Sequence, residues 1–219
     1  PPIYTIFPYT TLFRSNPPYM NAGYMPDKIK SFILQNYSDY KADLFSAFFQ
    51  QVKYLCKSTG HIGLLSPYVW MFISSHEKAR ALVVKQSTLT SLVQLEYNAF
   101  EAACIPVAAF TMRNRHIANL SGEFIRLSDF NGIDVQEPKT LMAVNNRNCG
   151  YRYTAFSENF ERIPGSPVAY WVGEKMLNVF SQSLISKSAS IQEGLKTADN
   201  DRFIRKWYEI DYKIGRAHV

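Results

Sequence analysis

Residues 61–95, HIGLLSPYVWMFISSHEKARALVVKQSTLTSLVQL, contain the pattern from which the fold is predicted. The stretch opens with a short apolar run of the buried-strand type, which Pro67 closes. The serine pair at positions 74 and 75 can cap a helix, which we expect over Ser75–Lys85. Leu89–Leu95 then has the composition of a second strand.

The sequence on either side extends this pattern. Apolar residues at three-to-four spacing over Lys28–Cys56 predict two helices, with Asp43 favouring the start of the second and Gly60 ending it. Val107–Met112 and Phe124–Leu127 are typical of further strands. A strand, helix, strand, strand order at short spacing predicts an α/β sheet with an antiparallel hairpin at its edge.

The composition narrows the class of protein. The chain has 219 residues, 47% hydrophobic and 15% aromatic, enough for one sizeable core, and no run of about 18 apolar residues that would span a membrane. Three cysteines without a Cys-x-x-Cys pair favour neither disulfides nor a zinc site, and His61, His76 and His116 lack metal-ligand spacing. We therefore expect a cytoplasmic location, no membrane contact and no metal.

A change in composition predicts the domain organisation. From Asp129 onward Asn, Gly and Pro become frequent, which indicates irregular structure, and one helix follows at about 170–184. We place a domain boundary near Ser128, with one region over 16–128 and a second over 129–213.

The two ends resemble translated sequencing adapters. Thr5–Ser15, TIFPYTTLFRS, differs by one residue from TLFPYTTLFRS, the translation of the forward adapter of short-read DNA libraries, and Ile214–Val219 matches the opposing adapter. We interpret 1–15 and 214–219 as adapter-derived. The β-branched and aromatic residues of Thr5–Leu12 still favour a strand before residue 16. Without the two arginines of these ends the formal charge falls from +6 to +4, an excess that fits a polyanionic partner.

Asn16, Pro17, Pro18 and Tyr19 form the motif that indicates chemistry. An amine conjugated to a ring is a poor nucleophile, and two acceptors that hold its hydrogens can free its lone pair. The Asn16 side-chain oxygen and the Pro17 carbonyl are two such acceptors, and Tyr19 can stack on a planar target. The alternative is an ordinary turn, which Asn-Pro also starts.

The order of elements after this motif resembles the second half of an S-adenosylmethionine (AdoMet)-dependent amino-methyltransferase domain. In the adenine-N6 branch of that family an aromatic residue before the last strand completes the base pocket, and Phe100 stands at that position. The alternative for Phe100 is a core aromatic. The glycine-rich AdoMet turn of this fold belongs upstream of Asn16, so the cofactor-binding residues stay unknown.

Six further segments are similar to the adenine-specific DNA methyltransferase of bacteriophage exclusion (BREX) systems. They are KADLFSAF (41–48), PYVWMFISS (67–75), LVQLEY (92–97), IRLSDF (125–130), IPGSP (163–167) and GLKTADNDRF (194–203). Ala198 departs from the glycine of the family's Thr-Gly-Asp-Asn loop, a position suited to positive φ.

The resemblance implies an incomplete Rossmann-like methyltransferase fold over 16–128 and the start of a target-recognition region over 129–213. It implies AdoMet as cofactor, and double-stranded DNA and other phage-defence proteins as partners. Asn200, Arg202, Arg205 and Lys206 lie at the entry to the recognition region, where they would contact DNA; the alternative is a solvated amphipathic segment.

The expected function is transfer of a methyl group from AdoMet to N6 of a flipped adenine in phage defence. The chain by itself is expected to be inactive, since it lacks the AdoMet turn. Two alternatives stay open: a protein-glutamine or ribosomal RNA methyltransferase with the same motif, and a DNA-recognition subunit without catalytic activity.

The adapter interpretation predicts that neither end is encoded in the source genome. Resequencing the source DNA with unrelated adapters should return a reading frame that matches residues 16–213 and diverges on both sides. Genomic DNA that still encodes TIFPYTTLFRS and IGRAHV at these positions would show the interpretation to be wrong.

Overall fold

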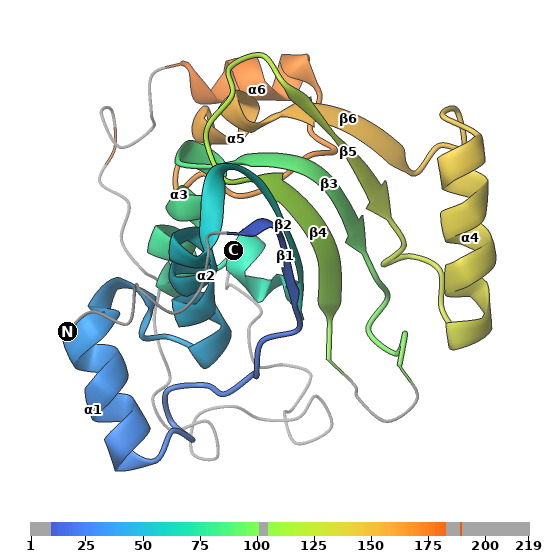
Figure 1. Ribbon diagram of the computed structural model, residues 1–219. Helices are drawn as coiled ribbons and strands as arrows, with labels where there is room; N and C mark the ends of the chain where they lie inside the picture. Colours follow the sequence, from blue (N-terminus) through green and yellow to red (C-terminus); the bar gives the residue numbers. More distant parts are fainter. Residues whose placement is uncertain (1–9, 101–104, 183–188, 190–219) are drawn as a thin grey trace, which may run out of the picture. The chain divides into compact units, whose positions relative to one another are not determined.

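The computed structural model describes residues 10–100, 105–182 and 189, and one compact unit ends at Gln182. Its centre is a six-stranded sheet of order β1-β2-β4-β3-β5-β6 (Figure 1). Strands β1, β2, β3 and β5 run parallel, whereas β4 and β6 are antiparallel to their neighbours. The strands are β1 (Thr10–Ser15), β2 (Cys56–Pro67), β3 (Thr88–Gln94), β4 (Val107–Arg113), β5 (Ser121–Arg126) and β6 (Arg152–Phe156).

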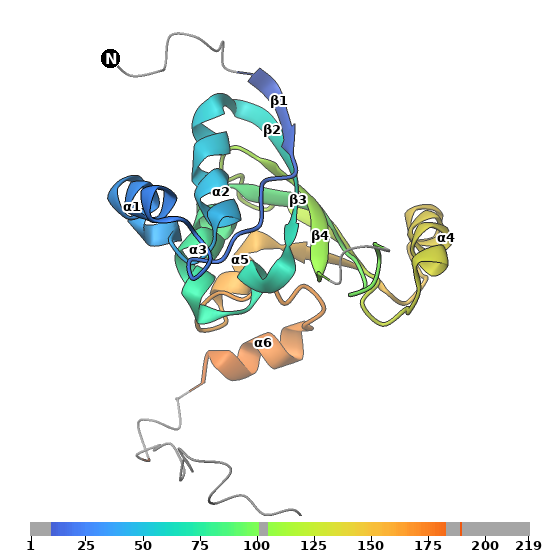
Figure 2. The ribbon, with the colours of Figure 1, turned by 90° about the horizontal axis from the view of Figure 1, so that it is seen from below.

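The helices divide between the two faces of the sheet. Helices α2 and α3 lie on one face, and α4 lies on the other, as Figure 2 shows. The helices are α1 (Asp27–Asn36), α2 (Leu44–Leu55), α3 (Glu77–Lys85), α4 (Ile133–Asn145), α5 (Ser157–Glu161) and α6 (Glu174–Phe180), with 3₁₀ turns η2 (Ser38–Tyr40), η3 (Tyr68–Met71) and η4 (Ser74–His76). In the described part of the chain, no helix combines the length and apolar character needed to cross a membrane.

The main core lies between the sheet and α2 and α3. The strand registers place Leu64, Phe110, Leu92 and Phe124 in one row across four strands, and all four are buried. Phe49 of α2 packs its ring edge on Phe110, with centroids 5.7 Å apart. This row of large apolar side chains explains why amphipathic helices cover this face.

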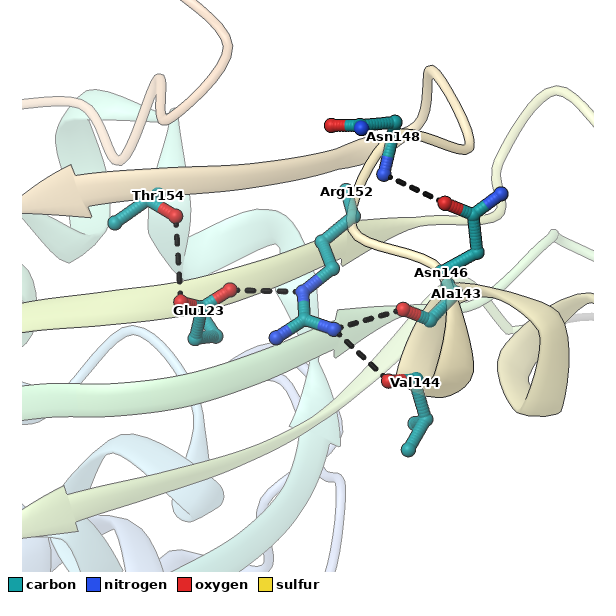
Figure 3. A network of polar contacts seen from close by, with 7 residues as sticks. All are labelled: Glu123, Ala143, Val144, Asn146, Asn148, Arg152 and Thr154. Atoms are coloured by element: carbon teal, nitrogen blue, oxygen red, sulfur yellow. Dashed lines mark hydrogen bonds and ion pairs between the residues drawn. The ribbon is translucent and has the colours of Figure 1, made fainter.

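The opposite face is covered at one end by α4. Figure 3 shows how Arg152 of β6 holds this helix to the sheet. Its Nε donates to the Glu123 carboxylate at 2.8 Å, and its Nη1 donates to the carbonyls of Ala143 and Val144 at 2.9 and 3.1 Å. Because those carbonyls belong to the last turn of α4, where backbone acceptors lack helical partners, the guanidinium also caps the helix.

The α/β sheet and most of its predicted elements are confirmed. The two helices expected over Lys28–Cys56 are α1 and α2, and Asp43 accepts a hydrogen bond from the Phe45 N–H at the start of α2. Gly60 does not end α2, because the chain extends directly into β2 at Cys56. The serines at 74 and 75 do not cap α3; they form η4, and the residue before α3 is His76.

The antiparallel hairpin of β3 and β4 is not at the edge of the sheet. Strand β4 lies between β2 and β3, and β5 and β6 extend the sheet beyond β3. Sequence order could not show this, because these pairings join strands that are distant along the chain.

The compact unit continues past the boundary expected near Ser128. Strand β6 pairs with β5, and Phe160 and Tyr170 are buried against Phe124 in the main core. The compact unit therefore extends to Gln182 and is not divided at Ser128. Helix α6 begins four residues later than the helix expected at about 170–184, whose last residues lie outside the described part.

A strand does precede residue 16, as the composition predicts. Strand β1 runs parallel to β2 with Phe13 opposite Ile62 and Ser15 opposite Leu64. Residues 1–9 lie outside the described part, so only Thr10–Leu12 of the strand predicted over Thr5–Leu12 can be compared.

Arg80 of α3 links the segment before its own helix to the distant loop at Gly165, so we expect its replacement to lower the stability of the fold. Its guanidinium is buried and donates to the carbonyls of Trp70, Ile73 and Gly165 at 2.8 Å each. Arg80→Met should lower the free energy of unfolding by about 3 kcal/mol or more, since three carbonyls lose a charged donor. Urea denaturation of the chain measures this effect.

Lys85→Met is the matched control, because Lys85 lies on the same helix and its ion pair with Glu161 is exposed. That variant should lose less than about 1 kcal/mol. Equal losses in the two variants would contradict the role assigned to Arg80.

Candidate active site

The Asn-Pro-Pro-Tyr motif lies at the carboxyl end of β1. It leaves the sheet as an irregular segment, because two consecutive prolines cannot continue a strand or begin a helix interior. The carboxyl ends of β1, β2, β3 and β5 share this edge, since the four strands are parallel. In open α/β sheets, ligands bind outside the carboxyl ends of the strands.

Asn16 and Tyr19 are in direct contact. The Tyr19 hydroxyl donates to Asn16 Oδ1 at 2.6 Å and also lies 3.3 Å from the Leu65 carbonyl. Asn16 is exposed, Pro17 is buried and Tyr19 is half-buried. Burial raises the pKa of Tyr19, so its hydroxyl keeps its proton at neutral pH. The amide oxygen has two lone pairs, and one remains available for an incoming donor.

The segment after the motif is tied to the start of α2. Asp43 Oδ1 accepts from the Met20 N–H at 2.9 Å and from the Phe45 N–H at 3.3 Å. Backbone hydrogen bonds run from Leu44 N–H to Met20 O at 3.0 Å and from Ala22 N–H to Ala42 O at 3.1 Å. These bonds fix the direction in which the chain leaves Tyr19.

Aromatic and polar side chains behind Tyr19 support its ring. Phe45 meets Tyr19 edge to face, with ring centroids 6.3 Å apart, and its other side stacks on His76 at 5.2 Å. His76 Nδ1 forms a 2.7 Å hydrogen bond with Ser46 Oγ, and both residues are buried. Tyr19 is thus held by a packed cluster and not by the motif alone.

Phe100 lies at the same edge of the sheet as Tyr19. It follows β3 and is 44% exposed, so it is not a core aromatic. Among the described residues no ring contact joins Phe100 to Tyr19, and β2 and β4 separate their strands. Glu96, also beyond β3, is buried; its Oε2 accepts from the Asn98 N–H at 2.8 Å, and its own N–H donates to Gln136.

A hollow of about 530 Å³ opens beside Asn16 on the face of the sheet away from α2. Its lining includes small residues of three strands, Gly63, Ser91 and Ala109, and at the β1 end Arg14, Ser15 and Asn16. This volume is in the range of small-molecule sites. Sequence reasoning missed the hollow, because only the sheet register brings these strands together.

The predicted DNA-contacting residues Asn200, Arg202, Arg205 and Lys206 lie outside the described part of the chain. The three histidines considered above have different surroundings: His76 is buried, His116 lies 3.4 Å from Glu158, and His61 contacts Arg113. Within the described residues, no group of three His, Cys, Asp or Glu side chains is placed to hold a metal ion.

Comparisons with known proteins show which families this chain is similar to. Residues 15–100 match the family model of the Eco57I restriction-modification methylases. The chain is 32% identical over 207 residues to the adenine-specific methyltransferase PglX of Lacticaseibacillus casei, covering 92% of this chain and 17% of that protein. It is 32% identical over 200 residues to the adenine-specific methyltransferase BrxX of Escherichia coli, covering 90% and 16%.

The predicted similarity to adenine-specific methyltransferases is therefore confirmed along nearly the whole chain, which spans about a sixth of the length of these relatives. A solved structure supports the predicted fold. The methyltransferase subunit of a type I restriction-modification system from Streptococcus thermophilus superposes with a TM-score of 0.51 at 18% identity, over 72% of this chain and 36% of that one.

His76 is buried in the cluster that supports Tyr19. We therefore expect the free energy of unfolding to depend on pH through this histidine. Burial, together with the positive charge of Arg80, lowers the pKa of His76 to about 4. The unfolded chain takes up this proton near pH 6.5, so stability is complete above that pH and falls as the pH drops toward 4, by about 3 kcal/mol. His76→Asn should be less stable at pH 7 and should show a shallower loss.

Urea denaturation at several pH values between 7 and 4 tests this expectation. The difference in unfolding free energy between the native chain and His76→Asn should shrink as the pH falls. A constant difference would show that His76 does not titrate with folding.

Proposed function

We propose that this chain is part of a DNA adenine-N6 methyltransferase that acts in phage defence in the cytoplasm. The single observation that carries the proposal is the contact of Tyr19 with Asn16 at the carboxyl end of β1, in a segment that matches a methylase family. The identity to adenine-specific methyltransferases over nine-tenths of the chain supports adenine as the target.

Each residue of the motif would have a different role in the reaction. A flipped adenine would stack on Tyr19, with Phe100 closing the pocket from the β3 side, because N6 is out of reach within the base stack. Asn16 Oδ1 and the Pro17 carbonyl would accept the two N6 hydrogens and direct the nitrogen lone pair outward. The Tyr19 hydroxyl donates to Asn16 Oδ1 at 2.6 Å, whereas the stacking role proposed for Tyr19 needs only its ring.

AdoMet, when bound, supplies a methyl group on a good leaving group. The neutral amide oxygen of Asn16 suits the positively charged, methyl-bearing end of that cofactor. We place the remaining cofactor contacts in the part of the protein that precedes residue 16, so the 219-residue chain alone is proposed to be inactive.

The domain limits belong to this proposal. We propose that residues 1–15 and 214–219 are adapter-derived. We also propose that 129–213 leads into the target-recognition region, where Asn200, Arg202, Arg205 and Lys206 would meet DNA.

Substitutions of Asn16 and Tyr19 in the full-length enzyme test the proposal. Asn16→Ala should lower the single-turnover rate of methyl transfer by about 10² or more, as expected for loss of a polar group at a reacting centre, with DNA affinity nearly unchanged. Tyr19→Ala should weaken capture of the flipped base by roughly 1 to 3 kcal/mol. Tyr19→Phe keeps the stacking face and should retain most activity.

Single-turnover methylation and a fluorescent base analogue at the target position separate the two effects. An Asn16→Ala enzyme that methylates at the native rate would contradict the assignment, and so would a Tyr19→Phe enzyme as inactive as Tyr19→Ala. Methylation of a protein glutamine or of ribosomal RNA, with none of DNA, would favour the alternative substrates.

A further inference from the structure

A second hollow lies on the far side of the segment that follows the motif. Its volume is about 520 Å³, and its lining comes from four separate parts of the chain. Ala22 and Ala42 form one wall, and they are joined by the 3.1 Å backbone hydrogen bond described above. One wall of the hollow is therefore formed by the same backbone hydrogen bonds that fix the path of the chain after Tyr19.

The polar side chains around this hollow are mainly positive. Lys30 of α1, Lys41 after η2 and Lys78 of α3 line it, with Asp39 as the single acidic side chain of the lining. All three lysines are exposed, and within residues 10–100 and 105–182 none of them forms an ion pair. Three unpaired cations facing one hollow repel one another, so a polyanion that enters gains Coulomb energy with each of them.

The rest of the lining also suits nucleic acid. Ser38 and Ser75 offer hydroxyl groups beside the lysines, and Met25 and Ile33 form a buried apolar floor. Lysine and serine are residues that contact phosphate oxygens in protein–DNA interfaces. Apolar floor atoms can pack against deoxyribose, which has few polar groups. Cations on three separate elements fit an extended chain of phosphates better than one compact anion.

We propose that this hollow holds the sugar–phosphate backbone of the DNA strand that carries the target adenine, with Lys30, Lys41 and Lys78 on its phosphates. The proposal rests on the proposed function and extends it to a named DNA surface. The bridge between Asn21 and Asp43 connects this hollow with the candidate active site. DNA phosphates held in the hollow would therefore position the target nucleotide beside Tyr19.

The salt dependence of DNA binding by the full-length enzyme tests the proposal. Each lysine on a phosphate contributes about 0.9 to the slope of log affinity against log salt. Lys30→Gln, Lys41→Gln and Lys78→Gln combined should therefore make the slope shallower by between about 2 and 3. The loss of affinity should be the same for target and non-target duplexes, since phosphates carry no sequence information.

A triple variant of equal charge is the control. Lys28, Lys57 and Lys175 are exposed and do not line the hollow, and Lys28 lies only two residues from Lys30 on another face of α1. Changing these three to Gln should leave the slope nearly unchanged. Thermal unfolding midpoints of both triple variants should equal that of the native enzyme, because all six side chains are on the surface.

Equal slopes for the two triple variants would overturn the proposal, and so would a lysine-dependent slope seen with RNA and not with DNA. Methylation assays on the same preparations separate this result from the proposed function. An enzyme that methylates adenine but has an unchanged slope refutes only the lysine assignment. An enzyme with the expected slope that forms no N6-methyladenine refutes only the proposed activity.

Discussion

The carboxylate of Asp43 is the contact on which the candidate site depends. One oxygen accepts N–H groups from both Met20 and Phe45, so it caps α2 and holds the segment after the motif with the same atom. Burial raises the pKa of Asp43 although backbone hydrogen bonds lower it, which shows that desolvation of the carboxylate is only partly offset. This partly buried carboxylate joins two segments that are distant from each other along the chain.

Helix α2 passes this constraint to the rest of the fold. Its buried face packs Phe49 on Phe110 of the sheet, while Phe45 near its first turn supports Tyr19. The helix cannot shift without disturbing both contacts, because ring packing in a core leaves little free volume. The position of the Tyr19 ring is therefore set by the packing of the sheet, and the two prolines need only direct the chain toward it.

Local features of this fold could be predicted from sequence, and non-local ones could not. The start of α2 depends on Asp43 and apolar spacing that lie within a few residues, and the strands show runs of apolar residues. The place of the β3–β4 hairpin inside the sheet depends on the pairing of β5 with β3 and of β6 with β5, and both added strands come later in the chain. Helix α4 escaped prediction because it contains Pro138 and exposes Leu141 and Met142, so its apolar residues mark no clear buried face.

The same distinction applies to the candidate site. Asn16 and Tyr19 were predicted because they are separated by only two residues, and their chemistry can be read from the motif. The hollow with Lys30, Lys41 and Lys78 was missed because these residues come from three elements, and no spacing along the chain brings them together.

The two hollows also differ in the part of a nucleotide that they can recognise. The backbone hydrogen bonds between residues 20–22 and 42–44 connect them. The hollow beside Asn16 is lined mainly by small and apolar residues, with one amide, Asn16, and one cation, Arg14, which suits a planar group held by shape and few hydrogen bonds. The hollow beyond Ala22 is lined by three lysines, which attract negatively charged phosphates whatever base they carry. Because the backbone hydrogen bonds between positions 20–22 and 42–44 link the two hollows, capture of a phosphate and insertion of a base would be coupled steps under the proposed function. A nucleotide could then be selected by its base at one side while most of its binding energy comes from its backbone at the other.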